Sequence, residues 1–268
     1  MRKLALCSVM LLMLGATPAL SLSDKPYLVE TDADFANLLP PPPADGSARD
    51  KSDMQAVLDL QKTLTPERLE RIQADTEQSV YRVAGEVLGP DFTKDRFPLA
   101  GAFFDKINKD SVVGVRAIKQ KYKRLRPFQA SKEVQSPPNI AAASQGPTYP
   151  SGHGTFGAEV ALLLSMMVPE KRTELFARGW QYGEQRIASG VAYPSDWEGG
   201  HIGATVMVAL MLQKPEFKAD FEATKAEIRK GLGLAPLTRE NSAIPSIPPR
   251  WAPLQPRCAL TNINVFDG

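Results

Sequence analysis

The sequence predicts a single all-α domain, a helical bundle with irregular segments at both ends. Apolar residues recur at helical spacing from about Met54 to Leu232. Strand-like alternation of apolar and polar residues over any length is missing, and no repeat or interior linker divides the chain. With 268 residues, 43% of them apolar, the chain is long enough to bury a core of its own.

The first residues have the pattern of an export signal. Arg2 and Lys3 precede a short apolar run that ends at Gly15, and small and polar residues follow it. This order is typical of a secretory signal peptide, which we predict over residues 1–23. The run is short for a bilayer span and no longer one follows, so we expect no membrane anchor after cleavage.

Composition limits the classes of partner that the chain could bind and the disulfides that it could form. A net charge of +2 argues against a nucleic-acid binder, because such proteins concentrate many unbalanced basic residues on one face. Cys7 is expected to leave with the signal, so Cys258 stands alone and the mature chain closes no internal disulfide.

Residues 24–53 predict an extended arm before the helical domain, which we place over residues 54–268. The arm is polar and contains the run Pro40–Pro43, whose residues cannot donate backbone hydrogen bonds and favour a polyproline conformation. The far end of the chain, from Thr238, is also rich in proline and is expected to be irregular.

Between these ends the apolar periodicity predicts successive helices. Thr65 followed by Pro66 is typical of a helix start, and the apolar stretch before Met167 predicts a buried helix. Further helices are expected over 76–88, 98–109, 111–122, 154–167, 170–188, 196–212 and 215–232.

Three short segments carry residue types that suit one chemical task. The first is Lys119, separated by six residues from Arg126-Pro127; the second is Pro150-Ser151-Gly152-His153; the third places Arg186 ten residues before Asp196. Basic side chains bind phosphate oxygens through charged hydrogen bonds, and a helix beginning at Ser151-Gly152 adds free backbone N–H groups. An imidazole such as that of His153 has an ordinary pKa suited to protonating a leaving oxygen.

Taken together, the segments resemble the signature of the PAP2 phosphatase superfamily: Lys-x6-Arg-Pro, Pro-Ser-Gly-His and Ser-Arg-x5-His-x3-Asp. The leader and the proline-rich arm are similar to those of class A bacterial non-specific acid phosphatases. The resemblance implies an all-α PAP2-type fold, a periplasmic location and hydrolysis of small phosphate monoesters. It implies no metal ion or cofactor, and it leaves a homo-oligomer open.

The resemblance also implies a role for each residue of the pattern. In the family a histidine attacks phosphorus and forms a phosphohistidine, and an aspartate orients it. Here Asp196 is the expected orienting carboxylate and His153 the expected general acid. The residues expected to hold the phosphate are Lys119, Arg126, Ser151, Gly152 and Arg186.

Ala192 departs from that pattern at the nucleophile position, five intervening residues after Arg186. Alanine has no attacking atom, so the covalent route is closed there. Gln185 also replaces the family's serine. His201 lies five residues beyond Asp196 and well round a helix from it, which favours a place on the helix face over a substitute nucleophile.

The departure leaves several interpretations open. Ala192 is either an introduced substitution in an active phosphatase or a natural change, and the otherwise complete site favours the first. A non-catalytic phosphate binder is the main alternative function. A vanadium haloperoxidase shares the signature but holds vanadate through the same histidine, and the missing membrane spans argue against a lipid phosphatase.

Overall fold

The computed structural model describes residues 21–237, and every regular element within them is helical, as the sequence predicts. The α-helices are α1 (Ala48–Gln61), α2 (Pro66–Ala74), α3 (Val80–Leu88), α4 (Pro98–Tyr122), α5 (Pro127–Ala130), α6 (Pro138–Ala143), α7 (Gly152–Met167), α8 (Arg172–Ala188), α9 (Pro194–Met211) and α10 (Pro215–Gly231). Short 3-10 turns are η1 (Glu30–Asp32), η2 (Phe35–Asn37) and η3 (Pro169–Lys171). Most of the predicted signal peptide, the whole proline-rich tail from Thr238, Cys7 and Cys258 lie outside the described residues.

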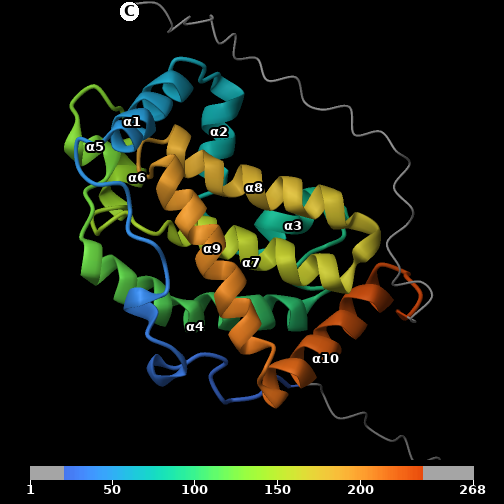
Figure 1. Cartoon of the computed structure of the whole chain (residues 1–268). Helices are drawn as coiled ribbons and strands as arrows, with labels where there is room; N and C mark the ends of the chain where they lie inside the picture. The colour runs from blue at the N-terminus through green and yellow to red at the C-terminus, as the bar shows by residue number, and fades with distance from the viewer. Residues whose placement is uncertain (1–20, 238–268) are drawn as a thin grey trace, which may run out of the picture. The chain divides into compact units, whose positions relative to one another are not determined.

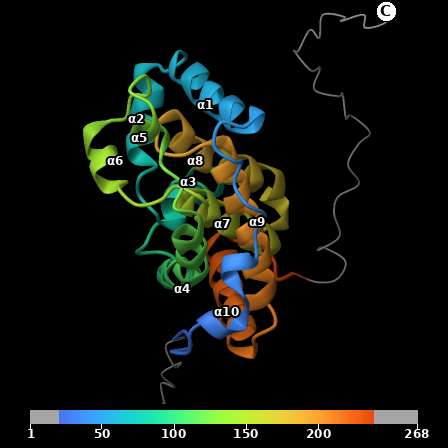
Figure 2. The same ribbon diagram turned by 60° about the vertical axis from the view of Figure 1, so that its left-hand side comes forward.

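Helices α7, α8 and α9 form the centre of the bundle. Helices α7 and α8 lie side by side and α9 crosses them, while α4 lies on the side of α7 away from α8 (Figures 1 and 2). A Cβ atom at Gly157 would stand 2.9 Å from the carbonyl oxygen of Gly179, and one at Gly179 would stand 2.6 Å from that of Gly157. The two glycines therefore let α7 and α8 approach to backbone contact.

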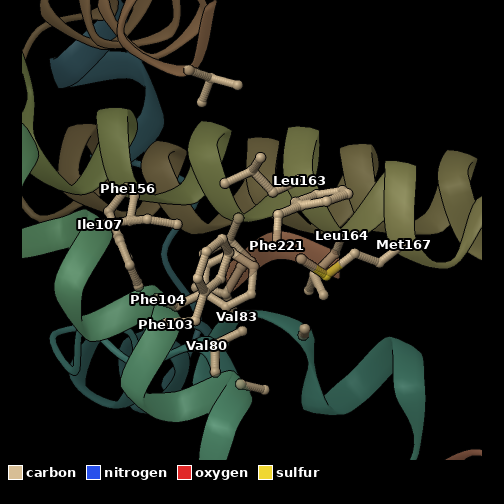
Figure 3. Close-up of a cluster of buried hydrophobic side chains, with 14 of the residues drawn as sticks. Val80, Val83, Phe103, Phe104, Ile107, Phe156, Leu163, Leu164, Met167 and Phe221 are labelled. Atoms are coloured by element: carbon tan, nitrogen blue, oxygen red, sulfur yellow. The ribbon is translucent and has the colours of Figure 1, made fainter. Parts of the chain in front are cut away.

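The main hydrophobic core lies between α7 and α4. Figure 3 shows side chains of α7 pointing toward aromatic residues of α4, with α3 and α10 contributing at the edges. The labelled members are Val80, Val83, Phe103, Phe104, Ile107, Phe156, Leu163, Leu164, Met167 and Phe221. Burying each such side chain contributes about 1.5–3 kcal/mol, so this cluster fixes the helix that begins at Gly152.

Several helix boundaries differ from the sequence prediction. Helix α4 is continuous where a break was expected near Asp110, and its buried face includes the polar Asp110 and Ser111, whose side chains bond to the Tyr27 backbone N–H at 2.7 Å and to Glu159. Helix α1 begins at Ala48, inside the segment expected to be extended, because Ser47 caps it by accepting from the Asp50 N–H at 3.2 Å.

Helix α3 starts at Val80 rather than at Thr76. Ser79 is its N-cap and accepts from the Arg82 N–H at 3.1 Å, so residues 75–79 form a loop instead of a first turn. That loop reaches the candidate site described below.

The proline run lies beside α9 as an arm without helix. The Tyr149 hydroxyl donates to the Pro40 carbonyl at 2.6 Å, and Leu39 is buried. A groove lined by Pro40–Pro43, Tyr149 and Ser195 runs along this contact. Among the helices of residues 21–237, none is long and apolar enough to cross a membrane.

Glu159 gives the core a dependence on pH. It is fully buried on α7, where one carboxyl oxygen accepts from the Ser111 hydroxyl and the other has no partner among the described residues. Burial raises its pKa from 4.5 to about 8. Between those values the folded chain binds more protons than the unfolded chain, so stability falls as pH rises.

We therefore expect Glu159→Gln to raise the melting temperature at pH 8 by about 5 °C and to change it little at pH 5. Thermal unfolding at both pH values measures the difference. The control is Glu86→Gln, since Glu86 lies on the surface with Arg71 and has a lowered pKa. An equal change of melting temperature in Glu159→Gln at both pH values would contradict the raised pKa of Glu159.

Candidate active site

The N-terminus of α7 presents free backbone donors. Ser151 is the N-cap, and its hydroxyl accepts from the Gly154 N–H at 3.1 Å. The Ser151 N–H donates to the Asp196 carbonyl at 2.9 Å, while the N–H groups of Gly152 and His153 have no partner within residues 21–237. Two unpaired N–H groups at the positive end of a helix dipole favour an anion.

A tight turn after α8 carries position 192 into the same region. Gly190 has φ +73°, a left-handed backbone conformation that residues with a Cβ atom rarely adopt. A Cβ there would also stand 2.6 Å from the Gln135 carbonyl oxygen. The N–H groups of Val191 and Ala192 then both donate to the Arg186 carbonyl at 3.1 Å. Position 192 is thereby fixed over the end of α8.

Basic side chains from separate segments meet around that turn. Arg126 donates to the Val191 carbonyl at 2.7 Å and to the Gly146 carbonyl at 2.8 Å. Lys119 donates to the carbonyls of Pro147 and Thr148 at 2.5 and 2.9 Å.

Arg186 completes the set, and its guanidinium donates to the Ser144 hydroxyl at 3.0 Å. Its remaining N–H groups have no hydrogen-bond partner in the described part of the chain. Lys119 and Arg126 also have more N–H groups than these contacts use. Donors are therefore available for a further acceptor.

These side chains are all positively charged and repel one another. Burial, with a further contribution from Arg126, lowers the pKa of Lys119 to about 7 and that of Arg186 to about 10. Burial also lowers the pKa of Arg126. A bound anion would attract all three side chains and so favour their charged forms. A phosphate dianion would therefore balance the positive charge of the cluster.

His153 lies on α7 against the loop before α3. Its Nε2 is 3.2 Å from the Thr76 carbonyl oxygen, so in the neutral ring Nε2 carries the proton and donates. The ring stacks on Tyr182 at a centroid distance of 5.6 Å. Burial first, and then the charge of Arg186, lower the pKa of His153 to about 3. The imidazole is thus neutral in the free protein.

Asp196 is fully buried at the start of α9. One carboxylate oxygen accepts from Thr148 Oγ1 and from the Tyr193 N–H, both at 2.7 Å, and the other accepts from Arg124 at 2.9 Å. Burial raises the pKa of Asp196, and the charge of Arg124 opposes that shift. The oxygen facing Arg124 retains capacity for one more donor.

The structure brings all the predicted site residues into one region, and their chemical roles stay predictions. Ala192 is buried and offers only a methyl group. Gln185, also buried, has a side-chain oxygen without a donor among the described residues. His201 is not part of the cluster: its Nδ1 lies 3.0 Å from the Trp197 carbonyl, and its ring packs on Trp180 and Trp197.

Sequence reasoning missed several residues that hold the site together. Arg124, Ser144 and Thr148 contact the predicted residues directly, but the three motifs do not specify them: Arg124 stands at an unspecified position of the first, and the other two lie outside all three. Arg124 stands two residues before Arg126, and this proximity was the only signal in the sequence. Ser144 and Thr148 lie in an irregular segment, where no periodicity predicts a contact.

Comparison with known proteins gives consistent matches. The profile of the PAP2 superfamily matches residues 109–219. A non-specific acid phosphatase of Providencia stuartii is 31% identical over 214 residues, covering 76% of this chain and 85% of that protein. A non-specific acid phosphatase of Salmonella typhimurium is 25% identical, covering 71% and 78%. An acid phosphatase of Zymomonas mobilis is 24% identical, covering 72% and 74%.

Proposed function

The chain belongs to the PAP2 superfamily and to its non-specific acid phosphatases, and from that premise we propose a specific state of the site. In this proposal the chain binds small phosphate monoesters among its basic side chains, and Ala192 removes the covalent step of hydrolysis. With alanine at position 192 the chain is a phosphate-binding form of a phosphomonoesterase, and histidine at that position converts it to a catalyst.

One observation carries the proposal: the anion-binding donors are present around a position that lacks a nucleophile. Lys119, Arg126 and Arg186 keep unused N–H donors, and the α7 N-terminus adds two backbone groups. Charged side-chain donors and a helix N-terminus are what a tetrahedral dianion requires. The backbone at Val191 and Ala192 is held in place, because both N–H groups donate to the Arg186 carbonyl and the Val191 carbonyl accepts from Arg126.

With histidine at position 192, the reaction proceeds in two displacements. The imidazole attacks phosphorus and forms a P–N bond while the P–O bond to the leaving group breaks. His153 donates a proton to the leaving oxygen, and Nδ1 is its nitrogen without a protein partner. Water then attacks the phosphohistidine, its proton returns to His153, and inorganic phosphate and free histidine result.

The low pKa of His153 fits an acid that is charged only when substrate is bound. In the free protein the nearby cations and burial keep the ring neutral above about pH 3. A phosphate dianion places negative charge beside the ring and raises its pKa. The site therefore assembles its proton donor upon binding, and mildly acidic conditions favour that state.

We also propose that the chain is exported to the periplasm. The basic start, apolar run and small-residue exit of residues 1–23 support this location. N-terminal sequencing of the protein recovered from a periplasmic fraction tests it, and an uncleaved chain in the cytoplasm would contradict it.

Anion binding by the chain as written is the direct test of the phosphate-binding state. Sulfate is a suitable probe because it stays doubly charged across the pH range in which Lys119 titrates. We expect its affinity to fall by about tenfold as pH rises through about 7, since Lys119 then loses its positive charge. Isothermal titration calorimetry at several pH values measures the change.

The matched variant is Lys119→Met, which keeps the length of the side chain but not its charge. It is expected to bind sulfate weakly at every pH and to lose the pH dependence. Arg116→Met, on the exposed side of the same helix, is expected to bind as the parent does. Binding that is equal in the parent and in Lys119→Met would contradict the proposed site.

A further inference from the structure

Arg124 occupies a central position behind the candidate site. It follows α4, is 8% exposed, and its guanidinium lies 4.0 Å above the ring of Tyr193. One terminal nitrogen donates to Asp196 at 2.9 Å and to the Ser195 hydroxyl at 2.7 Å. The other terminal nitrogen points to α1.

On α1, that second nitrogen donates to Asp50 at 3.0 Å and to Asp53 at 3.1 Å. Asp53 is buried and also accepts from the Ser195 hydroxyl. The backbone carbonyl of Arg124 accepts from the Thr148 N–H at 3.0 Å, and the Thr148 hydroxyl donates to Asp196. Arg124 therefore reaches the Asp196 carboxylate by two routes.

We propose that Arg124 is a positioning residue for Asp196, held in place by the acidic pair Asp50 and Asp53 of α1. It orients the carboxylate that must hold a histidine at position 192 and favours its ionised form. Helix α1 thereby becomes part of the catalytic apparatus, although none of its residues is placed at the phosphate. This role rests on the proposed phosphatase function.

The electrostatic surroundings explain why an ionised Asp196 needs this support. Full burial disfavours its charged form, and the charge of Arg124 is the largest opposing contribution. The other charged and titratable groups near Asp196 are Lys119, Arg126, Tyr149 and Tyr193. Those near Arg124 are Asp50 and Asp53, and Arg49 lies 3.7 Å from Asp53. Neutralising Arg124 would leave several carboxylates buried without their shared cation.

The experiment compares pH–rate profiles for an aryl phosphate in an Ala192→His background. We expect Arg124→Met and the milder Arg124→Lys to lower kcat by about 10- to 100-fold, because the nucleophile loses its alignment, and to leave KM nearly unchanged. In Arg124→Met, which removes the positive charge, the acidic limb of the profile is expected to move to higher pH, since it reports the coupled titration of the carboxylate and the new imidazole.

Asp53→Asn provides a variant with the opposite expected shift. It keeps an acceptor for Arg124 but removes a negative charge, so the acidic limb is expected to move to lower pH. Arg229→Met is the structural control, because Arg229 is equally buried and paired with Glu170 on the far end of the bundle. Opposite shifts from Arg124→Met and Asp53→Asn, with a smaller shift in Arg124→Lys, support the proposal.

A lower melting temperature with an unmoved acidic limb, as expected for Arg229→Met, would overturn the proposal and leave Arg124 a structural residue. If Ala192→His shows no turnover at all, the proposed function fails instead. Arg124 is then tested in the chain as written by a carbon-13 NMR titration of the Asp196 carboxyl. A midpoint that rises in Arg124→Met supports the role, and an unchanged midpoint overturns it.

Discussion

Replacing Ala192 with histidine is expected to raise the turnover of an aryl phosphate at mildly acidic pH by roughly 10³-fold or more. The increase follows from geometry already present. The backbone of residues 191 and 192 is held by hydrogen bonds to Arg186 and Arg126, so a side chain introduced there starts from a fixed position. Asp196 has remaining capacity to accept its N–H. Steady-state hydrolysis of p-nitrophenyl phosphate measures the gain.

Two matched variants separate a restored nucleophile from a general improvement of the site. Ala192→Asn adds a polar side chain of similar shape without an attacking nitrogen, and no gain is expected. Gln185→Ser reverses the other departure from the family pattern and is also expected to give no turnover alone. A comparable rate in Ala192→Asn and Ala192→His would refute nucleophilic attack from this position.

Loss of the proton donor is expected to have the second-largest effect. In the Ala192→His background, His153→Gln should lower kcat for an alkyl phosphate by about 10²- to 10⁴-fold. The effect on p-nitrophenyl phosphate should be about tenfold or less, because nitrophenolate leaves without needing a proton. Glutamine keeps a donor that can reach the Thr76 carbonyl, so the local fold is preserved.

The ratio of the two kcat losses is the informative quantity. A general acid acts on the leaving oxygen, so the loss must grow with the basicity of the leaving group. A merely structural role for His153 predicts equal losses for both substrates. Measuring a series of phosphate esters with graded leaving groups distinguishes these outcomes, with Tyr182→Phe as a control for the stacking contact.

The helical fold was predictable because it depends on local pattern. Apolar spacing and capping residues such as Thr65 act within one or two turns. The continuity of α4 was not predictable, since Asp110 and Ser111 interrupt its apolar face and find partners that are 83 and 48 residues away. Helix ends that depend on such distant partners leave no trace in a short window of sequence.

The candidate site also contains residues that the sequence could predict and residues that it could not. Residues in the motifs, such as Lys119, His153 and Asp196, could be named because their types and spacing resemble a known pattern. Arg124 could not, because its importance arises from where α1 and α9 place Asp53 and Asp196. The low pKa of His153 was equally hidden, since it depends on burial against the loop before α3.

The comparisons and the structure support different parts of the account. Similarity to acid phosphatases identifies the family, while the arrangement of donors around Ala192 supports the specific proposal that only the attacking atom is missing. The proposal therefore depends on position 192, where the sequence departs most from the family pattern.

Trapping the phosphoenzyme tests directly whether position 192 supplies the attacking atom. The Ala192→His protein is mixed with substrate, quenched in alkali, where phosphohistidine survives, and its phosphopeptides are located by mass spectrometry. We expect one phosphoryl group per chain, on the histidine introduced at position 192, and none in the protein with Ala192. Turnover without a phosphorylated residue there, or phosphate found on His153 or His201, would contradict it.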